Sequence, residues 1–240
     1  MEKDLEVISY SQSSRRLSKL NMKINDYRVN RDDVENIEIA MDSTVISIYS
    51  NSDQHNKDNV KTRKYNRADQ VRKLHAALNI ESKKVIAIKY TNSTLRDSIL
   101  ACSMLEEMDG KYGISSIRAD ASYDGRNVYK ICKELNIKPI IRPIKNATVR
   151  EKVDYLSERN NNVKVIQSYK NYEDGVKEWK MVMKYGLRSH IEGFFFRLKK
   201  TFGFSLKNKS EMNREKELLI KCYLINRFTE IGMPKFETAA

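Results

Sequence analysis

Apolar side chains fill both alternating sets of positions between residues 37 and 49, in a stretch rich in isoleucine and valine. Successive side chains of a β-strand point to opposite faces, so this pattern predicts a strand that is buried on both faces. Two shorter apolar runs, 71–78 and 85–90, flank a mostly polar segment, 79–84, that predicts a tight turn. Three consecutive strands are therefore expected.

Helical spacing begins after the third predicted strand. Apolar residues recur three and four positions apart, and two such helices alternate with two short strands. The second of these short strands contains Pro139 and Pro143, which favour the edge of a sheet because proline cannot donate a backbone hydrogen bond. Three strands followed by alternating helices and strands predict an α/β fold built on a mixed sheet. The alternating elements are a helix over 93–108, a strand over 116–119, a helix over 124–135 and a strand over 138–144.

A further helix is predicted over residues 184–201, and it carries two different stripes. One stripe is apolar and typical of a core-facing surface, and the other is polar and centred roughly 120° away at about 100° per residue. The polar stripe is either a solvated face with an i, i+4 ion pair between Arg188 and Glu192, or a functional surface. The apolar stripe is Leu187, Ile191, Phe194 and Leu198, and the polar stripe is Tyr185, Arg188, Glu192 and Lys199.

The charge of the chain points to a polyanionic partner. Lysine and arginine number 45 against 32 aspartate and glutamate residues, a net charge of +13, and nucleic acid is the first candidate for such a surface. No apolar run approaches the roughly 20 residues of a membrane helix, so no membrane partner is expected. The first residues lack a secretory signal, and Cys102, Cys132 and Cys222 form no pair typical of a zinc site. We therefore expect a folded protein of the reducing cytoplasm.

Three carboxylates stand where a carboxylate is otherwise out of place. Asp42 interrupts the first predicted strand, and Asp120 ends the fourth. Glu192 is the only acid among seven lysine and arginine residues between positions 183 and 210. An isolated acid in a phosphate-binding surface repels DNA unless a divalent cation lies between the two. A cluster of three acids is typical of two-metal phosphoryl chemistry.

Each of these features also has a plainer interpretation. Asp42 would be a capped acid near a strand end, and Asp120 would cap the following helix, a role for which Asp124 competes because it directly precedes the helical pattern. The segment 57–73, with seven basic residues and two acids, would be a solvated loop. Its position directly after the first strand instead favours contact with a substrate backbone.

Three motifs together resemble the DDE transposases of bacterial and archaeal insertion sequences, in the branch with a Tyr-Arg-Glu-Lys signature. The spacing of that signature is met at all four of its positions, and the resemblance extends over roughly residues 37–228. The motifs are Asp42-Ser-Thr, Ala119-Asp120-Ala-Ser-Tyr-Asp124 and Tyr185-x2-Arg188-x3-Glu192-x6-Lys199, with further likeness in Lys73-Leu-His75, Thr91, Asp97-Ser98 and Lys199-x2-Phe202-Gly203.

The resemblance implies a ribonuclease-H-like fold, a mixed sheet flanked by helices, with an insertion over 145–180 ahead of the catalytic helix. The catalytic domain would span 37–230, followed by a tail over 231–240. Relatives usually carry a DNA-binding domain at the amino terminus, so residues 1–36 are expected to be the remnant of one in a shortened copy. Within them, 12–20 is either the last helix of a helix-turn-helix or a free amphipathic helix. Trp179, in the insertion, would either stack on a flipped base or anchor the next helix.

The resemblance also implies a function, that of a DNA transposase that hydrolyses the phosphodiester bond at a transposon end and transfers the strand into target DNA. It would use two Mg²⁺ ions, for which Mn²⁺ substitutes, act as a homodimer on DNA, and lie at the nucleoid of a prokaryotic cytoplasm. The alternatives are a ribonuclease-H-like nuclease or resolvase and a catalytically silent DNA-binding remnant. The expected catalytic residues and metal ligands are Asp42, Asp120 and Glu192, and the expected DNA-binding residues are Tyr185, Arg188, Lys199, Lys64, Arg67 and Lys200.

Overall fold

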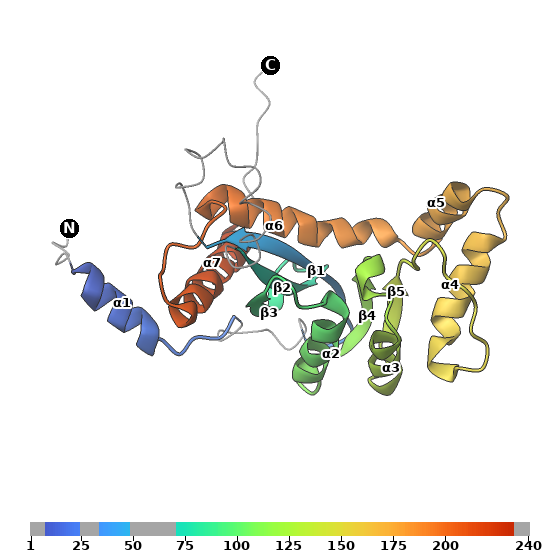
Figure 1. Ribbon diagram of the computed structural model, residues 1–240, viewed down its shortest axis with the longest axis horizontal. Helices are drawn as coiled ribbons and strands as arrows, with labels where there is room; N and C mark the ends of the chain where they lie inside the picture. Colours follow the sequence, from blue (N-terminus) through green and yellow to red (C-terminus); the bar gives the residue numbers. More distant parts are fainter. Residues whose placement is uncertain (1–7, 25–33, 49–70, 233–240) are drawn as a thin grey trace, which may run out of the picture.

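A mixed five-stranded sheet forms the centre of the molecule in the computed structural model, which describes residues 8–24, 34–48 and 71–232 (Figure 1). The strand order is β3-β2-β1-β4-β5. β1 and β3 are antiparallel to β2, whereas β4 is parallel to β1 and to β5. The predicted α/β fold, a mixed sheet flanked by helices, is therefore confirmed. The strands are β1 (Ile37–Ser47), β2 (Val71–Asn79), β3 (Val85–Asn92), β4 (Ile114–Ala119) and β5 (Lys138–Ile141).

Helices cover both faces of the sheet, with α2 and α3 on one side and α6 and α7 on the other (Figure 1). α4 and α5 form a separate pair beyond β5. The helices are α1 (Tyr10–Lys19), α2 (Asp97–Met108), α3 (Arg126–Glu134), α4 (Ser157–Gln167), α5 (Tyr172–Val182), α6 (Ser189–Phe202) and α7 (Glu211–Ile231), with short 3-10 turns η3 (Ala121–Tyr123), η4 (Asp154–Leu156) and η5 (Tyr185–Arg188).

The two hydrophobic cores follow from the alternation of side chains along β1. Ile37, Ile39 and Met41 are buried in the core that contains α2 and α3, whereas Ala40 and Ile46 are buried in the core that contains α6 and α7. A strand covered on both faces is what its nearly continuous apolar sequence predicts.

The strand predictions are confirmed with small shifts at the ends. β2 ends at Asn79, whose side chain accepts two backbone N–H groups of the turn that leads to Val85. β5 lies at the edge of the sheet, as its prolines favour, and it ends at Ile141, three residues before the predicted end. Pro143 has no N–H with which to extend the ladder. The predicted end of the first strand, at residue 49, lies outside the described residues.

The late helix predicted over 184–201 is divided into the turn η5 and the helix α6. Lys184 has a left-handed backbone, with φ of 48°, and separates both from α5. The apolar stripe is confirmed as core-facing: Ile191, Phe194 and Leu198 are buried, and Leu187 packs against the same core.

The insertion, expected only as a polar segment, folds into α4 and α5 around a small core. Gly175 lets the two helices approach closely, because a Cβ atom there would lie 2.2 Å from the carbonyl oxygen of Ile166. Trp179 is 1% exposed, and its ring centre lies 5.0 Å from that of Tyr185, so the anchoring interpretation of Trp179 is supported against base stacking. The core is built from Ile140, Ile166, Val176, Trp179 and Tyr185.

A buried ion pair holds this insertion on the central domain. The Asp124 side chain is fully buried and accepts hydrogen bonds from Arg159 Nε at 2.7 Å, the Tyr129 hydroxyl at 3.0 Å and the Ile144 N–H at 3.0 Å. The helix-capping role considered for Asp124 is therefore wrong. Gly125 is the N-cap of α3, and no side chain caps that helix.

α7 has no counterpart among the predicted elements. Its buried face mixes Leu218, Cys222 and Ile225 with the polar Asn226, whose amide pairs with both backbone groups of Val85 at the start of β3. Polar residues at buried positions interrupt the period on which the sequence prediction depended. No helix in the described part of the chain is long and apolar enough to cross a membrane.

α1 confirms the helix expected over 12–20 and begins two residues earlier, after a capping box formed by Ser9 and Gln12. It buries none of its side chains fully and contacts α7 through the Asn213 amide, which donates to the Ser14 hydroxyl at 3.0 Å. A DNA-binding role for residues 1–36 stays a prediction, because 1–7 and 25–33 lie outside the described residues, as 233–240 of the expected tail also do.

Candidate active site

The register of the sheet places Asp120 beside Asp42. The parallel pair of β1 and β4 aligns Ala40 with Arg118, and each aspartate lies two residues further along its own chain. Neighbouring strands are about 4.8 Å apart, so the two carboxylates belong to adjacent positions of the sheet. Asp120 follows the end of β4 and caps η3, since its Oδ1 accepts the Ser122 N–H at 2.8 Å. The interpretation of Asp120 as the cap of the following helix is wrong, because Asp120 caps the turn η3 and no side chain caps α3. This cap leaves Asp120 next to Asp42.

Asp42 is an acid whose charged form is disfavoured by its surroundings. Burial is the main reason that the pKa of Asp42 is raised above its usual value, and the charge of Asp120 raises this pKa further. The Ser43 N–H, which donates to Asp42 Oδ1 at 2.8 Å, and the charge of Arg188 act in the opposite direction without outweighing burial. Such a shift in a partly open site is typical of functional carboxylates.

Arg188 contacts both Asp42 and Glu192, the first and third of the expected catalytic acids. Its Nη1 donates to Asp42 Oδ2 at 2.8 Å, and its Nη2 contacts Glu192 Oε1. The Arg188 side chain is 18% exposed and that of Glu192 54%. The ion pair between Arg188 and Glu192, expected for a solvated helix face, is thus present. Arg188 also contacts Asp42 on β1, which a solvated face does not explain. The polar stripe faces the sheet at Asp42 and is more than a solvated surface.

Lys199 contacts the same face of β1. Its Nζ donates to Thr44 Oγ1 at 2.6 Å, and Thr44 lies two residues after Asp42 and so on the same face of the strand. Burial lowers the pKa of Lys199. Of the other expected DNA-binding residues, Lys200 is exposed on α6, and Lys64 and Arg67 lie outside the described residues.

Tyr185 is held by the end of β4. The side chain is 7% exposed, and its hydroxyl donates to the Ala119 carbonyl at 3.1 Å, one residue before Asp120. The Arg188 guanidinium lies 5.9 Å from the ring centre. Tyr185 therefore fixes the strand end that carries the second aspartate, and its expected contact with a DNA backbone stays a prediction.

A polar network beside Asp42 has members to which the sequence assigned no role. Asp97, the first residue of α2, accepts from Lys73 Nζ at 2.9 Å and lies 3.2 Å from His75 Nδ1, without the alignment of a hydrogen bond. Burial would raise the pKa of Asp97, but contacts with His75, Lys73 and Ser43 lower it instead. Because Ser43 directly follows Asp42, this network braces the strand at the site. Lys73 and His75 are two residues apart and so lie on one face of β2. This spacing of two polar residues in a strand was the sequence feature that could have indicated the network.

The donor chemistry of the site fits a divalent cation. Asp42 and Asp120 offer carboxylate oxygens, the hard ligands that Mg²⁺ prefers. Glu192, in contrast, is turned toward Arg188, and among the described residues no three acidic, histidine or cysteine side chains gather closely enough to hold a metal ion. The expected convergence of all three acids is therefore not found in this arrangement, in which the guanidinium supplies the positive charge between Asp42 and Glu192.

An open hollow of about 510 Å³ leads to these residues from the side of α5. Arg188 and Glu192 line it together with Lys180, Lys184 and Tyr185, so three cations and one acid meet at its surface. This charge balance suits a phosphate backbone.

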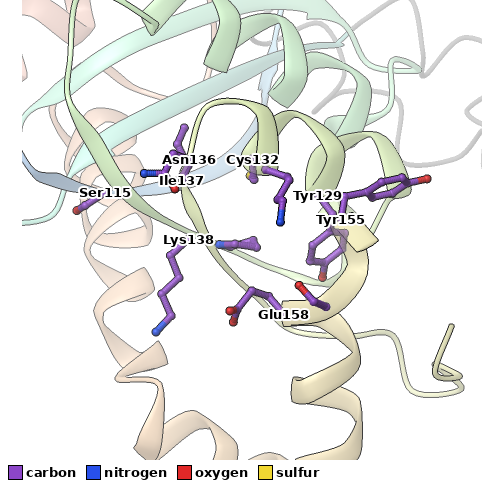
Figure 2. A pocket seen from close by; sticks show the side chains of 11 residues that line it. Ser115, Tyr129, Cys132, Asn136, Ile137, Lys138, Tyr155 and Glu158 are labelled. Carbon is purple, nitrogen blue, oxygen red and sulfur yellow. The ribbon is translucent and has the colours of Figure 1, made fainter. Parts of the chain in front are cut away.

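A separate cavity of about 320 Å³ lies at the amino ends of β4 and β5 (Figure 2). Ser115 and Lys138 in its lining belong to the beginnings of β4 and β5, whereas Asp120 follows the end of β4. In open sheets with parallel strands, ligands bind beyond the carboxyl ends of the strands. The cavity of Figure 2 is therefore not part of the candidate active site.

The fold and the site define an α/β domain that brings two carboxylates and several basic side chains together at the carboxyl ends of parallel strands. The chain belongs to the transposase DDE domain family, whose model matches residues 35–226. Enzymes of this family cleave DNA, transfer DNA strands and use divalent metal ions.

Solved structures show only distant likeness. A chain of the simian T-cell lymphotropic virus intasome in complex with the PP2A regulatory subunit B56 gamma is 17% identical, with a TM-score of 0.31 over 68% of this chain and 50% of that chain. The catalytic core domain of BIV integrase is 13% identical, with a TM-score of 0.29 over 82% of this chain and 99% of that chain. This chain thus spans about half the length of the intasome chain.

Proposed function

We propose that this protein is a metal-dependent DNA transposase that hydrolyses the phosphodiester bond at a transposon end and joins the freed 3′-hydroxyl to target DNA. The observation that carries the proposal is the contact of Arg188 with both Asp42 and Glu192, which brings the helix signature onto the strand of the first aspartate. Family membership supplies the reaction type.

Asp42, Asp120 and Glu192 would hold the metal, proposed as two Mg²⁺ ions that Mn²⁺ can replace. When bound, divalent cations supply polarisation of the scissile phosphate and activation of the attacking water or hydroxyl. Arg188 would exchange Glu192 and Asp42 for phosphate oxygens, which its planar guanidinium can bind with two parallel hydrogen bonds. Lys199 would add a point charge beside the same phosphate.

The remaining residues would orient this machinery. Tyr185 holds the end of β4 through the Ala119 carbonyl, and Asp97 holds Ser43 beside Asp42. Both act through another residue and are positioning residues. Lys200 on α6 and Lys64 and Arg67 in the segment 57–73 would contact the DNA backbone away from the scissile bond.

DNA is the proposed partner, at transposon ends and at the target, with the chain acting as a homodimer. Residues 37–230 would form the catalytic domain, 145–180 its insertion, and 1–36 the remainder of an end-binding region. A DNA substrate in a prokaryotic cell places the enzyme in the cytoplasm, at the nucleoid. A nuclease or resolvase would use the same carboxylates for hydrolysis alone, so an assay for joined DNA strands distinguishes it from a transposase.

Conservative removal of each charge tests the metal site. Asp42→Asn, Asp120→Asn and Glu192→Gln should each abolish Mg²⁺-dependent cleavage of DNA that carries the transposon end. Binding to DNA should be retained or strengthened, because a negative charge has left the phosphate site. Cleavage is measured on labelled duplex, and binding by fluorescence anisotropy.

Glu134→Gln provides the matched control, since Glu134 pairs with Lys130 on the surface of α3. It should leave cleavage and binding unchanged. Near-normal cleavage by any of the three active-site variants would remove that residue from the proposed machinery. A wild-type chain that cleaves but never joins strands would favour the nuclease. A wild-type chain that binds DNA without cleaving it would favour the silent remnant.

A further inference from the structure

Tyr123 carries a hydroxyl that packing does not require. The side chain is 1% exposed, in the core shared by the sheet, α2 and α3. Among the described residues, none forms a hydrogen bond with this hydroxyl. A buried hydroxyl without a partner costs about 1–3 kcal/mol, and phenylalanine would fill the same space without that cost. The hydroxyl therefore calls for another explanation.

Tyr123 is close in the fold to the strand end that carries the carboxylates of the candidate active site. Tyr123 is the third residue after Asp120, in the turn η3, and this turn packs against α2, the helix that begins with Asp97. Burial raises the pKa of Tyr123 well above its usual value, and the charges of Asp97, Asp42 and Asp120 raise it further. The phenol is therefore neutral at physiological pH and is available as a hydrogen-bond donor.

The carboxylates of the site have oxygens that can accept a hydrogen bond from such a donor. Both contacts of Asp120 with Ser122, at 2.8 Å from the N–H and 2.5 Å from the hydroxyl, use Oδ1. Asp42 Oδ2 is bound to Arg188. A carboxylate that ligates a metal is usually held by outer donors, and losing one of these typically costs 10- to 100-fold in metal affinity.

We propose that Tyr123 is a positioning residue of the metal site, whose buried hydroxyl donates a hydrogen bond to the Asp42–Asp120 carboxylate pair when that pair binds a divalent cation. The inference rests on the proposed function, because it requires that the two aspartates are metal ligands. The hydroxyl would gain its partner when the carboxylates bind the cation.

Tyr129 offers a matched control in the same core. It is also 1% exposed, but its hydroxyl already donates to Asp124 Oδ1 at 3.0 Å. Tyr129→Phe therefore breaks an existing hydrogen bond, whereas Tyr123→Phe removes a hydroxyl that has no partner in the metal-free fold. The two variants delete the same atom from equally buried rings.

The experiment titrates the full chain with Mn²⁺ alone, follows free Mn²⁺ by electron paramagnetic resonance, and measures thermal unfolding without metal. Tyr123→Phe should weaken Mn²⁺ binding by about 10- to 100-fold and leave metal-free stability unchanged or higher. Tyr129→Phe should lower metal-free stability and leave Mn²⁺ affinity unchanged. In cleavage assays, Tyr123→Phe should need more Mg²⁺ to reach half its maximal rate.

Asp42→Asn separates the two ways in which the idea can fail. If Asp42→Asn weakens Mn²⁺ binding and Tyr123→Phe does not, the role of Tyr123 is overturned and the metal site stands. If Asp42→Asn also has no effect, the metal site fails, and with it the proposed function and this inference. A loss of metal-free stability in Tyr123→Phe equal to that in Tyr129→Phe would show that the hydroxyl is already partnered, and would likewise overturn the proposal.

Discussion

At the scale of single residues, two carboxylates of this chain respond in opposite ways to partial burial. Asp42 has its pKa raised, because burial outweighs the contacts that favour its charge. Burial would also raise the pKa of Glu217, but hydrogen bonds from Lys221 and Asn208 outweigh it and lower the pKa. The surrounding fold thus stabilises the charged form of Glu217 and disfavours that of Asp42. A raised pKa of this kind agrees with the functional role proposed for Asp42, and the lowered pKa of Glu217 with a structural one.

Glu217 holds the loop that follows α6. Its carboxylate accepts the Lys207 N–H at 2.9 Å, the Asn208 N–H at 3.0 Å and the Asn208 amide at 2.8 Å. We predict that Glu217→Gln lowers the free energy of unfolding at pH 7 by about 1–3 kcal/mol, since charged hydrogen bonds are replaced by weaker ones.

The pH dependence of this loss has a definite sign. The folded-state pKa of Glu217 lies below the usual 4.5, so the unfolded chain binds the proton more tightly. The stabilisation is fully present above pH 4.5 and is lost as the pH falls through the lowered pKa. Wild type and Glu217→Gln should therefore converge in urea unfolding below pH 4.5. Glu215→Gln, an exposed neighbour on α7, is the control, and a gap independent of pH would contradict the prediction.

The residues of the site could be predicted only in part. Asp42, Arg188 and Lys199 were identifiable because each stands against its local pattern, an acid in an apolar strand or a polar stripe on a packed helix. Asp97 and Tyr123 stand in the quoted motifs, but no role for either of them followed from the sequence alone. A helix-starting aspartate and a buried tyrosine are ordinary in a sequence, and only the packing of α2 against β1 and against η3 relates them to the strand that carries Asp42.

At the scale of elements, the Asp124–Arg159 ion pair is a buried link between the insertion and the connection that follows β4. Arg159 also donates to the Thr148 carbonyl at 2.9 Å, so one side chain ties α4 to two other segments. We predict that Arg159→Met lowers the free energy of unfolding by about 3–5 kcal/mol, because it leaves the charge of Asp124 buried and unpaired. Urea unfolding measures the loss, and limited proteolysis should reveal new cuts within 145–180.

Lys164→Met is the control on the same helix. Lys164 pairs with Glu151 on the surface, where both side chains are more than half exposed, and its removal should change stability by less than about 0.5 kcal/mol. Adding Asp124→Leu to Arg159→Met should restore part of the lost stability, because no unpaired charge then remains. Equal effects of Arg159→Met and Lys164→Met would show that the buried pair does not hold the insertion.

The elements themselves were predictable wherever burial and hydrophobicity agree. β1 to β5, α2 and α3 follow from such patterns. α4 and α7 were missed because polar side chains occupy their buried positions. On α4 the buried Asn160 pairs with both backbone groups of Arg150, and on α7 Asn226 does the same with Val85. A buried asparagine looks like a surface residue until its backbone partner is known.

At the scale of the whole molecule, the net charge of +13 predicts DNA binding that depends steeply on salt. The logarithm of affinity should fall with the logarithm of salt concentration by about 0.9 per neutralised phosphate. We predict that Lys199→Gln with Lys200→Gln reduces the size of this slope by about 1.8, the value for two phosphate contacts. Anisotropy titrations on random duplex DNA at several salt concentrations measure it.

Lys130→Gln, on the opposite side of the sheet in α3, should leave the slope unchanged. The same titrations on Lys64→Gln with Arg67→Gln test the basic segment 57–73 independently. A slope that neither the α6 variant nor the variant in segment 57–73 alters would place the DNA on another surface of the molecule.

The position of Arg188 has a consequence for the order of events on DNA. One guanidinium cannot neutralise Asp42 and Glu192 and also bind a phosphate with the same nitrogens. A phosphate that draws Arg188 away leaves two carboxylates without their counter-ion and raises their affinity for a divalent cation. By thermodynamic reciprocity, a cation bound there raises the affinity for DNA by the same factor. Under the proposed function, each ligand would therefore raise the affinity of the site for the other, and without DNA the contacts of Arg188 would neutralise Asp42 and Glu192.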